Sequence, residues 1–171
     1  MTDFDKNLEP RSVNFVPLTP LDFIARSAQV YGAMPAIVYG KTRRSWSQTY
    51  QRCRRLASSL AARGITRNDT VAVLLPNIPE MVEVHFAVPM TGGVLNALNT
   101  RLDYATLLFM LRHGEAKLLI IDSEYSPLAE KIKTDLPDLI VIGVHDDQAN
   151  TPANPAMWMD YEVLINEGDP E

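Results

Sequence analysis

The sequence contains almost no cysteine and no long hydrophobic run, and each shortage excludes a class of protein. Its single cysteine, Cys53, cannot form a disulfide within the chain, so a disulfide-stapled secreted scaffold is excluded and a reducing compartment is expected. No apolar stretch approaches the roughly 18 residues that a membrane-spanning helix needs. Residues 1–10 are polar and acidic, without the apolar core of a secretion signal. The sequence therefore predicts a cytoplasmic protein with no membrane span.

Motifs that bind metals or nucleotides are also missing. The histidines His85, His113 and His145 stand far apart, so no metal-ligand spacing is present. Pro76-Asn77 follows the first buried run, where a dinucleotide site would need a glycine-rich turn. A Walker loop and a Gly-x-Ser-x-Gly nucleophile elbow are absent as well. From the residues alone we assign no catalytic residue, no metal ligand and no bound cofactor.

What the chain does contain is typical of one globular α/β domain. Its 171 residues are 46% hydrophobic and 22% charged, which suffices for one ordinary domain. Short apolar runs are unbroken rather than alternating, which indicates strands that are buried on both faces. Helical segments separate these runs, so the sequence predicts a layered, mostly parallel sheet flanked by helices. The expected strands are 71–75, 118–121 and 139–144, with 94–98 as a fourth.

A short hairpin is predicted before the buried strands. Residues 36–39 and 43–46 read as strands around the turn pair Gly40-Lys41. Ser47 is the expected N-cap of the helix that follows, with the arginines of that helix on its solvated side. Cys53 lies on the apolar stripe of this helix and is interpreted as a buried, inert thiol.

Two regions of the chain are expected. Residues 1–145 form the α/β part. Residues 146–171 are acidic and contain prolines, and they predict a surface tail that carries one short helix over 161–166.

Charge is unevenly distributed, although the net charge is only −5. No acidic residue lies between Asp22 and Asp69, and all the charged residues in that span are lysines or arginines. This basic span is either a patch for an anionic partner, such as nucleic acid or nucleotide phosphates, or a face that meets acidic surface in this chain or in a remainder of the protein. No aromatic-rich binding pattern accompanies the arginines, so nucleic acid is not expected as a partner.

Polar residues that follow the expected strands are the candidate binding residues. In open α/β sheets, ligands bind beyond the carboxyl ends of the strands. Arg101 is the most attractive of these residues because a guanidinium offers two donors to a phosphate or carboxylate. A structural salt bridge is the alternative for Arg101. The candidate segments are Pro76-Asn77, Asn99-Thr100-Arg101, Asp122-Ser123 and His145-Asp146.

Two histidine-containing patterns have simpler explanations than catalysis. Glu80 and Glu83 share a helical turn beside His85, and a carboxylate–histidine pair can do acid–base work. A solvated helix face is the interpretation that we favour for these three residues. Asp103 is the expected N-cap of another helix, which ends at Arg112-His113-Gly114, so His113 is interpreted as part of a helix C-terminus.

Five short segments follow one another in a specific order and spacing. They are WSQTY at 46–50, PNIPE at 76–80, HFAVP at 85–89, LNTRL at 98–102 and RHGEAK at 112–117. Taken together, they resemble the opening third of an AMP-forming acyl-CoA synthetase, one of the adenylate-forming acid–thiol ligases. They are most similar to the branch that handles short- and medium-chain fatty acids, and the resemblance covers nearly the whole chain.

The resemblance implies the N-terminal segment of a ligase, with residues 1–145 as the N-terminal part of its AMP-binding domain. In that family ATP converts a carboxylic acid into an acyl-adenylate, and the thiol of coenzyme A then displaces AMP. ATP, magnesium and coenzyme A are thus implied for the complete enzyme, with a carboxylic acid as substrate and the rest of the ligase as partner. The family's phosphate-binding loop has no counterpart here, and the tail 146–171 is expected to lead toward it.

The missing loop implies that this segment alone is inactive and binds no cofactor. Arg101 remains the one candidate for a cofactor contact. A non-catalytic α/β binding or interaction module is the alternative function.

Overall fold

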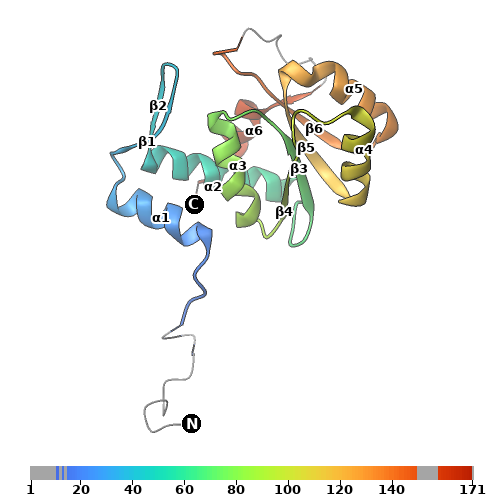
Figure 1. The fold of residues 1–171 in the computed structure, drawn as a ribbon. Helices are drawn as coiled ribbons and strands as arrows, with labels where there is room; N and C mark the ends of the chain where they lie inside the picture. Colours follow the sequence, from blue (N-terminus) through green and yellow to red (C-terminus); the bar gives the residue numbers. More distant parts are fainter. Residues whose placement is uncertain (1–10, 12, 14, 150–157, 171) are drawn as a thin grey trace.

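The central layer of the protein is a five-stranded parallel sheet (Figure 1). The structure is a computed structural model that describes residues 11, 13, 15–149 and 158–170. The strand order is β4-β3-β5-β6-β7, and each neighbouring pair is parallel. The predicted α/β class and parallel sheet are confirmed. The strands are β3 (Thr70–Leu74), β4 (Val94–Ala97), β5 (Ala116–Asp122), β6 (Ile140–Val144) and β7 (Met159–Asp160).

The central strands are apolar on both faces because helices cover both faces of the sheet. In β5, Leu118, Leu119, Ile120 and Ile121 are each 0% exposed. Successive side chains of a strand point to opposite faces. Leu118 and Ile120 accordingly join the core on one face of the sheet, and Leu119 and Ile121 join the core on the other. The apolar run in the sequence is unbroken because both faces of the strand are buried.

The helices divide between the two faces of the sheet. The connection from β3 to β4 runs over one face of the sheet, and the connection from β5 to β6 runs over the other. Strands β3 and β5 are neighbours in the sheet. Among the described residues, no helix has the length and hydrophobicity needed to cross a membrane. One face carries α1 (Pro20–Val30), α2 (Trp46–Ala62), α3 (Pro79–Met90) and α6 (Tyr161–Glu167), whereas the other carries α4 (Tyr104–His113), the short turn η2 (Ser123–Tyr125) and α5 (Ser126–Asp135).

The predicted hairpin is a separate two-stranded sheet. Strand β1 (Pro35–Tyr39) pairs antiparallel with β2 (Thr42–Ser45). Gly40 has a φ of +50° in the turn, a conformation that glycine adopts without steric cost. Figure 1 shows this hairpin standing apart from the large sheet, next to α2.

The start of α2 differs from the prediction by two residues. Ser45, and not Ser47, is the N-cap, because its Oγ accepts a hydrogen bond from the backbone N of Gln48 at 3.3 Å. The Gln48 side chain in turn accepts from the backbone N of Ser45 at 2.8 Å. This reciprocal pair is a capping box, which requires Glu or Gln three residues after the cap. Ser45 meets that requirement, so the prediction of Ser47 as the cap is wrong.

Helix α4 has the N-cap that the sequence predicts, but at its C-terminal end the residue with a left-handed φ is not the glycine. Asp103 caps the helix by accepting a hydrogen bond from the backbone N of Thr106 at 2.9 Å. Gly114 follows the helix with a φ of −81°, whereas Glu115 has the left-handed φ of +50°. A Cβ at Gly114 would lie 3.0 Å from the carbonyl oxygen of Met110, which is closer than ordinary van der Waals contact.

Part of the segment predicted as a surface tail packs into the core, within residues 158–170. Strand β7 pairs with β6 at the edge of the sheet, and α6 packs against α2 in the core. Tyr161, Leu164 and Ile165 are at most 1% exposed, so the description as a surface loop is wrong there. The short helix predicted over 161–166 is confirmed as α6. Residues 150–157 lie outside the described residues, and the division of the chain at residue 146 stays a prediction.

We expect Leu164→Ala to lower the free energy of unfolding by about 2–5 kcal/mol, because it leaves a cavity in a fully buried site. The matched control is Val163→Ala in the same helix, since Val163 is 52% exposed. The control should change stability by no more than about 0.5 kcal/mol. Urea unfolding of both variants measures the difference, and equal effects would show that α6 is not part of the core.

Candidate functional site

The predicted candidate residues gather at one edge of the large sheet. All paired strands are parallel, so the carboxyl ends of β3, β4, β5 and β6 lie on the same side. The chain reverses direction across the sheet between the neighbours β3 and β5. In open α/β sheets, such a switch point is where ligands bind. Pro76-Asn77 lies just after β3, and Asp122-Ser123 lies at the end of β5.

Asp122 at the switch point has an unusual environment. Its side chain is buried, and Oδ1 accepts a hydrogen bond from the backbone N of Glu124 at 2.8 Å. Oδ2 is buried and has no hydrogen-bond partner among the described residues. Burial raises the pKa of the Asp122 carboxyl, and the negative charges of Asp146 and Glu124 raise it further. A buried acceptor of this kind costs free energy until a donor reaches it.

Asp146, at the end of β6, links the hairpin to the same edge. The hydroxyl of Tyr39 donates to Oδ2 of Asp146 at 2.6 Å, and the backbone N of Gln148 donates to Oδ1 at 2.9 Å. The hydrogen bond to Asp146 raises the pKa of Tyr39 to about 12. The sequence did not reveal this pair, because its members lie 107 residues apart and neither belongs to a recognisable motif.

Arg101 follows β4 as predicted. The side chain of Asn99 accepts a hydrogen bond from the backbone N of Arg101 at 2.9 Å, which shapes the turn. Arg101 itself is exposed, and within the part of the chain that the structure describes its guanidinium forms no ion pair. The structural salt bridge that was the alternative for Arg101 is therefore not formed there.

An apolar groove lies beside the carboxyl edge, between β1 and the start of α3. It has a volume of about 410 Å³, and its lining includes Asn77 of the switch point. Val38 and Val82 on its walls are 63% and 43% exposed. A mostly apolar cleft with a few polar groups is typical of a small-molecule site. The groove and the carboxyl edge together form the candidate site.

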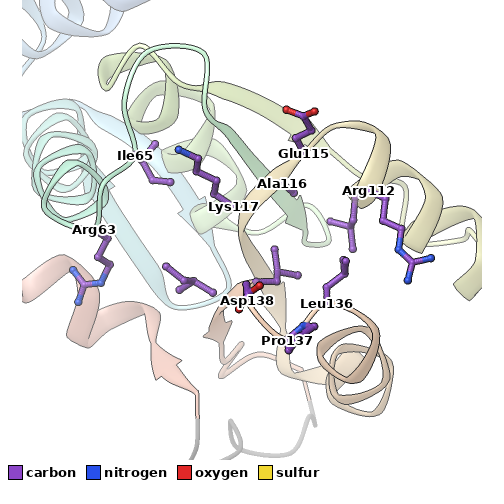
Figure 2. Close-up of a pocket in the computed structure, with 12 residues that line it drawn as sticks. Arg63, Ile65, Arg112, Glu115, Ala116, Lys117, Leu136, Pro137 and Asp138 are labelled. Atoms are coloured by element: carbon purple, nitrogen blue, oxygen red, sulfur yellow. The ribbon is translucent and has the colours of Figure 1, made fainter.

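A second cavity, of about 530 Å³, lies at the opposite edge of the sheet (Figure 2). Its lining includes Ala116 and Ile140, the first residues of β5 and β6. Lys117 at its rim is paired with Asp69 at 2.6 Å, and this hydrogen-bonded pair lowers the pKa of Asp69 to about 2. The amino ends of parallel strands are not where such sheets bind ligands, so we assign no function to this cavity.

The acidic pair on α3 forms a buried ion-pair cluster. Glu83 is 0% exposed, and it accepts hydrogen bonds from Arg44 at 2.8 Å, from Nε of Arg52 at 2.6 Å and from the hydroxyl of Tyr161 at 3.0 Å. Arg44 also lies 3.4 Å from Glu80. The interpretation of this region as a solvated helix face is wrong, since a buried carboxylate is stable only with such partners.

His85 takes no part in this cluster. It is exposed, and its Nδ1 lies 2.6 Å from the carbonyl oxygen of Met81 in its own helix. The carboxylate–histidine pair that was the catalytic alternative is therefore not formed. His113 is also exposed and stacks on Phe109 at a ring-centroid distance of 5.4 Å, which agrees with its interpretation as a helix terminus.

Ionisation in the cluster follows from burial and pairing. Burial alone would lower the pKa of Arg52, but its hydrogen bonds to Glu162 and Glu83 raise that pKa above its ordinary value. Burial raises the pKa of the Tyr161 hydroxyl well above its ordinary value. Burial, together with the charge of Glu83, raises the pKa of the Cys53 thiol to about 12. Cys53 is therefore protonated and inert, as predicted.

Known proteins with the same fold and with a similar sequence are CoA ligases. Solved structures of acyl- and aryl-CoA ligases share its fold: an anthranilate–CoA ligase in complex with anthranoyl-AMP superposes with a TM-score of 0.82 at 19% identity, over 91% of this chain and 30% of that one. A benzoate–CoA ligase of Burkholderia xenovorans gives a TM-score of 0.74 at 17% identity, over 90% and 29%. The AMP-binding enzyme family matches residues 24–164, so the chain belongs to that family.

Curated relatives agree with this assignment. The chain is 44% identical to a peroxisomal butyrate–CoA ligase of Arabidopsis thaliana, over 96% of this chain and 30% of that protein. It is 42% identical to a peroxisomal trans-cinnamate:CoA ligase of Petunia hybrida, over 92% and 30%. It is also 40% identical to a 2-methylpropanoate–CoA ligase of Humulus lupulus, over 97% and 31%. The chain thus spans about 30% of the length of these relatives.

We expect Glu83→Gln to lower the free energy of unfolding by about 3–5 kcal/mol, since it removes the anion that compensates two partly buried arginines. Glu130→Gln on α5 is the matched control because Glu130 is exposed. It should change stability by about 0.5 kcal/mol or less. Urea unfolding at neutral pH provides the measurement, and a similar small effect of both variants would contradict a stabilising role for the cluster.

Asp122→Asn is expected to be more stable than the parent chain at pH 7. Because the pKa of Asp122 is raised in the folded chain, the folded state holds the proton at pH values where the unfolded state has lost it. The penalty is full above the raised pKa and disappears below the ordinary value of about 3.9.

Urea midpoints at pH 7 and below about pH 4 test this, with the exposed Asp138→Asn as the control for net charge. An equal gain in the control, or a gain that does not change with pH, would rule out the burial of Asp122 as the cause.

Proposed function

We propose that the chain is the N-terminal portion of a ligase that activates a fatty or other carboxylic acid with ATP and transfers the acyl group to coenzyme A. The observation that carries the proposal is the coverage: the similarity extends over 96% of this chain but only 30% of the butyrate–CoA ligase. The groups that complete the reaction then belong to the other part of the ligase. In this proposal the chain alone is inactive and that other part is its obligate partner.

The candidate site supports a contributing role for the chain. Arg101 offers an exposed guanidinium at the carboxyl edge, and it is the residue that we propose for contact with a phosphate or carboxylate. The buried Oδ2 of Asp122 has no hydrogen-bond donor among the described residues. In this proposal the rest of the ligase supplies that donor. Within the described ranges, no group of three or more His, Cys, Asp or Glu gathers to hold a metal ion. ATP, magnesium and coenzyme A are proposed as ligands of the complete enzyme on the basis of the family to which the chain belongs.

The substrate class follows from the names of the relatives. They are described as ligases of butyrate, 2-methylpropanoate, trans-cinnamate and benzoate. We propose a short- or medium-chain fatty acid or a related small carboxylic acid as the substrate of the complete enzyme. The apolar groove beside the carboxyl edge is consistent with a small hydrophobic acid.

The cellular location stays a prediction. The sequence predicts the cytoplasm, whereas several relatives carry names that place them in peroxisomes. Both compartments agree with a chain whose one cysteine is buried and free.

Carboxylate-dependent exchange of pyrophosphate into ATP tests the proposal directly. The isolated chain is expected to show no exchange, because no nucleotide-binding loop lies in it. A chimera is then made in which this chain replaces the matching part of the butyrate–CoA ligase. The chimera should exchange pyrophosphate in the presence of butyrate, whereas the remainder of that ligase alone, as the control, should not.

Exchange by the isolated chain would contradict the proposed inactivity. A soluble, folded chimera without exchange would instead favour the alternative, a non-catalytic α/β binding module.

A further inference from the structure

A small polar cavity lies between β2 and the first half of α2. Its volume is about 250 Å³, and none of its lining residues follows a strand of the large sheet. The lining contains no acidic residue and no apolar residue. We refer to this cavity as the arginine pocket, and its lining consists of Arg43, Arg44, Gln48, Gln51, Arg52 and Arg55.

The sequence places these donors together by simple spacing. Gln48, Arg52 and Arg55 recur at intervals of four and three residues in α2, and such residues share one face of a helix. Strand β2 ends at the residue before α2, and its arginines therefore lie next to that face. The capping box of Ser45 fixes this junction. The chain provides no acid between Asp22 and Asp69, so every counter-ion for these arginines comes from outside that span.

Arg44 and Arg52 are held in place by acidic residues that do not line the pocket. Oε1 of the buried Glu83 lies 2.8 Å from Arg44 and 2.6 Å from Arg52. Arg52 also donates to the exposed Glu162 at 2.5 Å. Guanidinium groups that are already fixed lose little conformational freedom when a ligand arrives. The floor of the arginine pocket is thus organised before any ligand binds.

The other two arginines have no acidic partner in the part of the chain that the structure describes. Arg43 donates only to the carbonyl oxygens of Gly40 and Thr42, at 2.7 and 2.8 Å. Nε of Arg55 is buried and has no hydrogen-bond partner among the described residues. An unsatisfied buried N–H costs free energy that an acceptor would recover. The positive charges of Arg43 and Arg55 are therefore not compensated by an acid among the described residues.

We propose that the arginine pocket binds the phosphate groups of a small phosphate-bearing molecule. Phosphate oxygens match the planar fork of a guanidinium, and one tetrahedral group can accept from several forks at once. A single carboxylate offers two oxygens and would leave part of this donor set unused. The inference uses residues of β2, α2, α3 and α6, and it does not depend on the proposed ligase activity.

Calorimetric titration of the 171-residue chain tests the pocket, with inorganic pyrophosphate as the probe at constant ionic strength. One saturable site is expected. The double variant Arg43→Gln/Arg55→Gln should bind at least about tenfold more weakly, because it removes charge-assisted hydrogen bonds. The matched control is Arg26→Gln/Arg67→Gln, which removes the same charge at exposed positions outside the pocket and should keep the parent affinity.

A second titration with ATP separates two sources of the same chemistry. Equal affinity for ATP and pyrophosphate assigns the pocket to nucleotide-borne phosphates, and exclusion of ATP assigns it to free phosphates. Because a variant can lose its fold, the Nε–H resonance of Arg55 in the parent chain provides an independent readout. It should move on addition of pyrophosphate, while the Nε–H resonances of Arg26 and Arg67 stay unchanged.

Three results would overturn the proposal. The first is no saturable binding at about 1 mM pyrophosphate. The second is equal weakening in the control double variant, which would show a general charge effect. The third is an Arg55 resonance that moves with an acidic peptide and not with pyrophosphate, which would assign the pocket to a protein partner.

Discussion

The buried carboxylate of Glu83 links four separate parts of the chain. It sits on α3 and binds Arg44 of the hairpin, Arg52 of α2 and Tyr161 of α6. A buried charge tolerates no missing partner, so these elements have to assemble together. A two-stranded hairpin is marginally stable on its own, and its anchoring to α3 gives β1 and β2 a defined position. The same charge orients the arginines that face the solvent between β2 and α2.

The large sheet provides the second constraint on the molecule. Helices on both faces make the central strands mostly apolar, so that polar residues gather near the strand ends. Those residues accumulate at the carboxyl edge, where Asp122 keeps an unsatisfied oxygen and an apolar groove lies open beside β1. The unmet acceptor and the exposed apolar side chains at this edge are consistent with the proposal that another part of a ligase packs there. The membership of the chain in the AMP-binding enzyme family agrees with this picture.

The sequence revealed features that depend on neighbours in the chain. Unbroken apolar runs identified the central strands, and Asp103 identified the start of α4, because period and capping are local properties. Glu83 was misread because its partners lie 31, 39 and 78 residues away, so its helix turn looked like any solvated one. Strand β7 was missed because it has two residues, too few for any pattern. The arginine-rich span indicated that a partner was needed. It did not reveal that Arg44 and Arg52 pair with acids of this chain, whereas Arg43 and Arg55 have no acidic partner among the described residues.

The single cysteine has a practical consequence. Cys53 is 0% exposed in the middle of α2, and its thiol stays protonated because its pKa is about 12. Alkylating reagents attack the exposed thiolate, so they reach this sulfur only when α2 separates from the core. The rate of labelling at Cys53 then reports the opening of the very packing that Glu83 organises. The chain thus carries its own probe of local opening, with no engineered residue and no competing thiol.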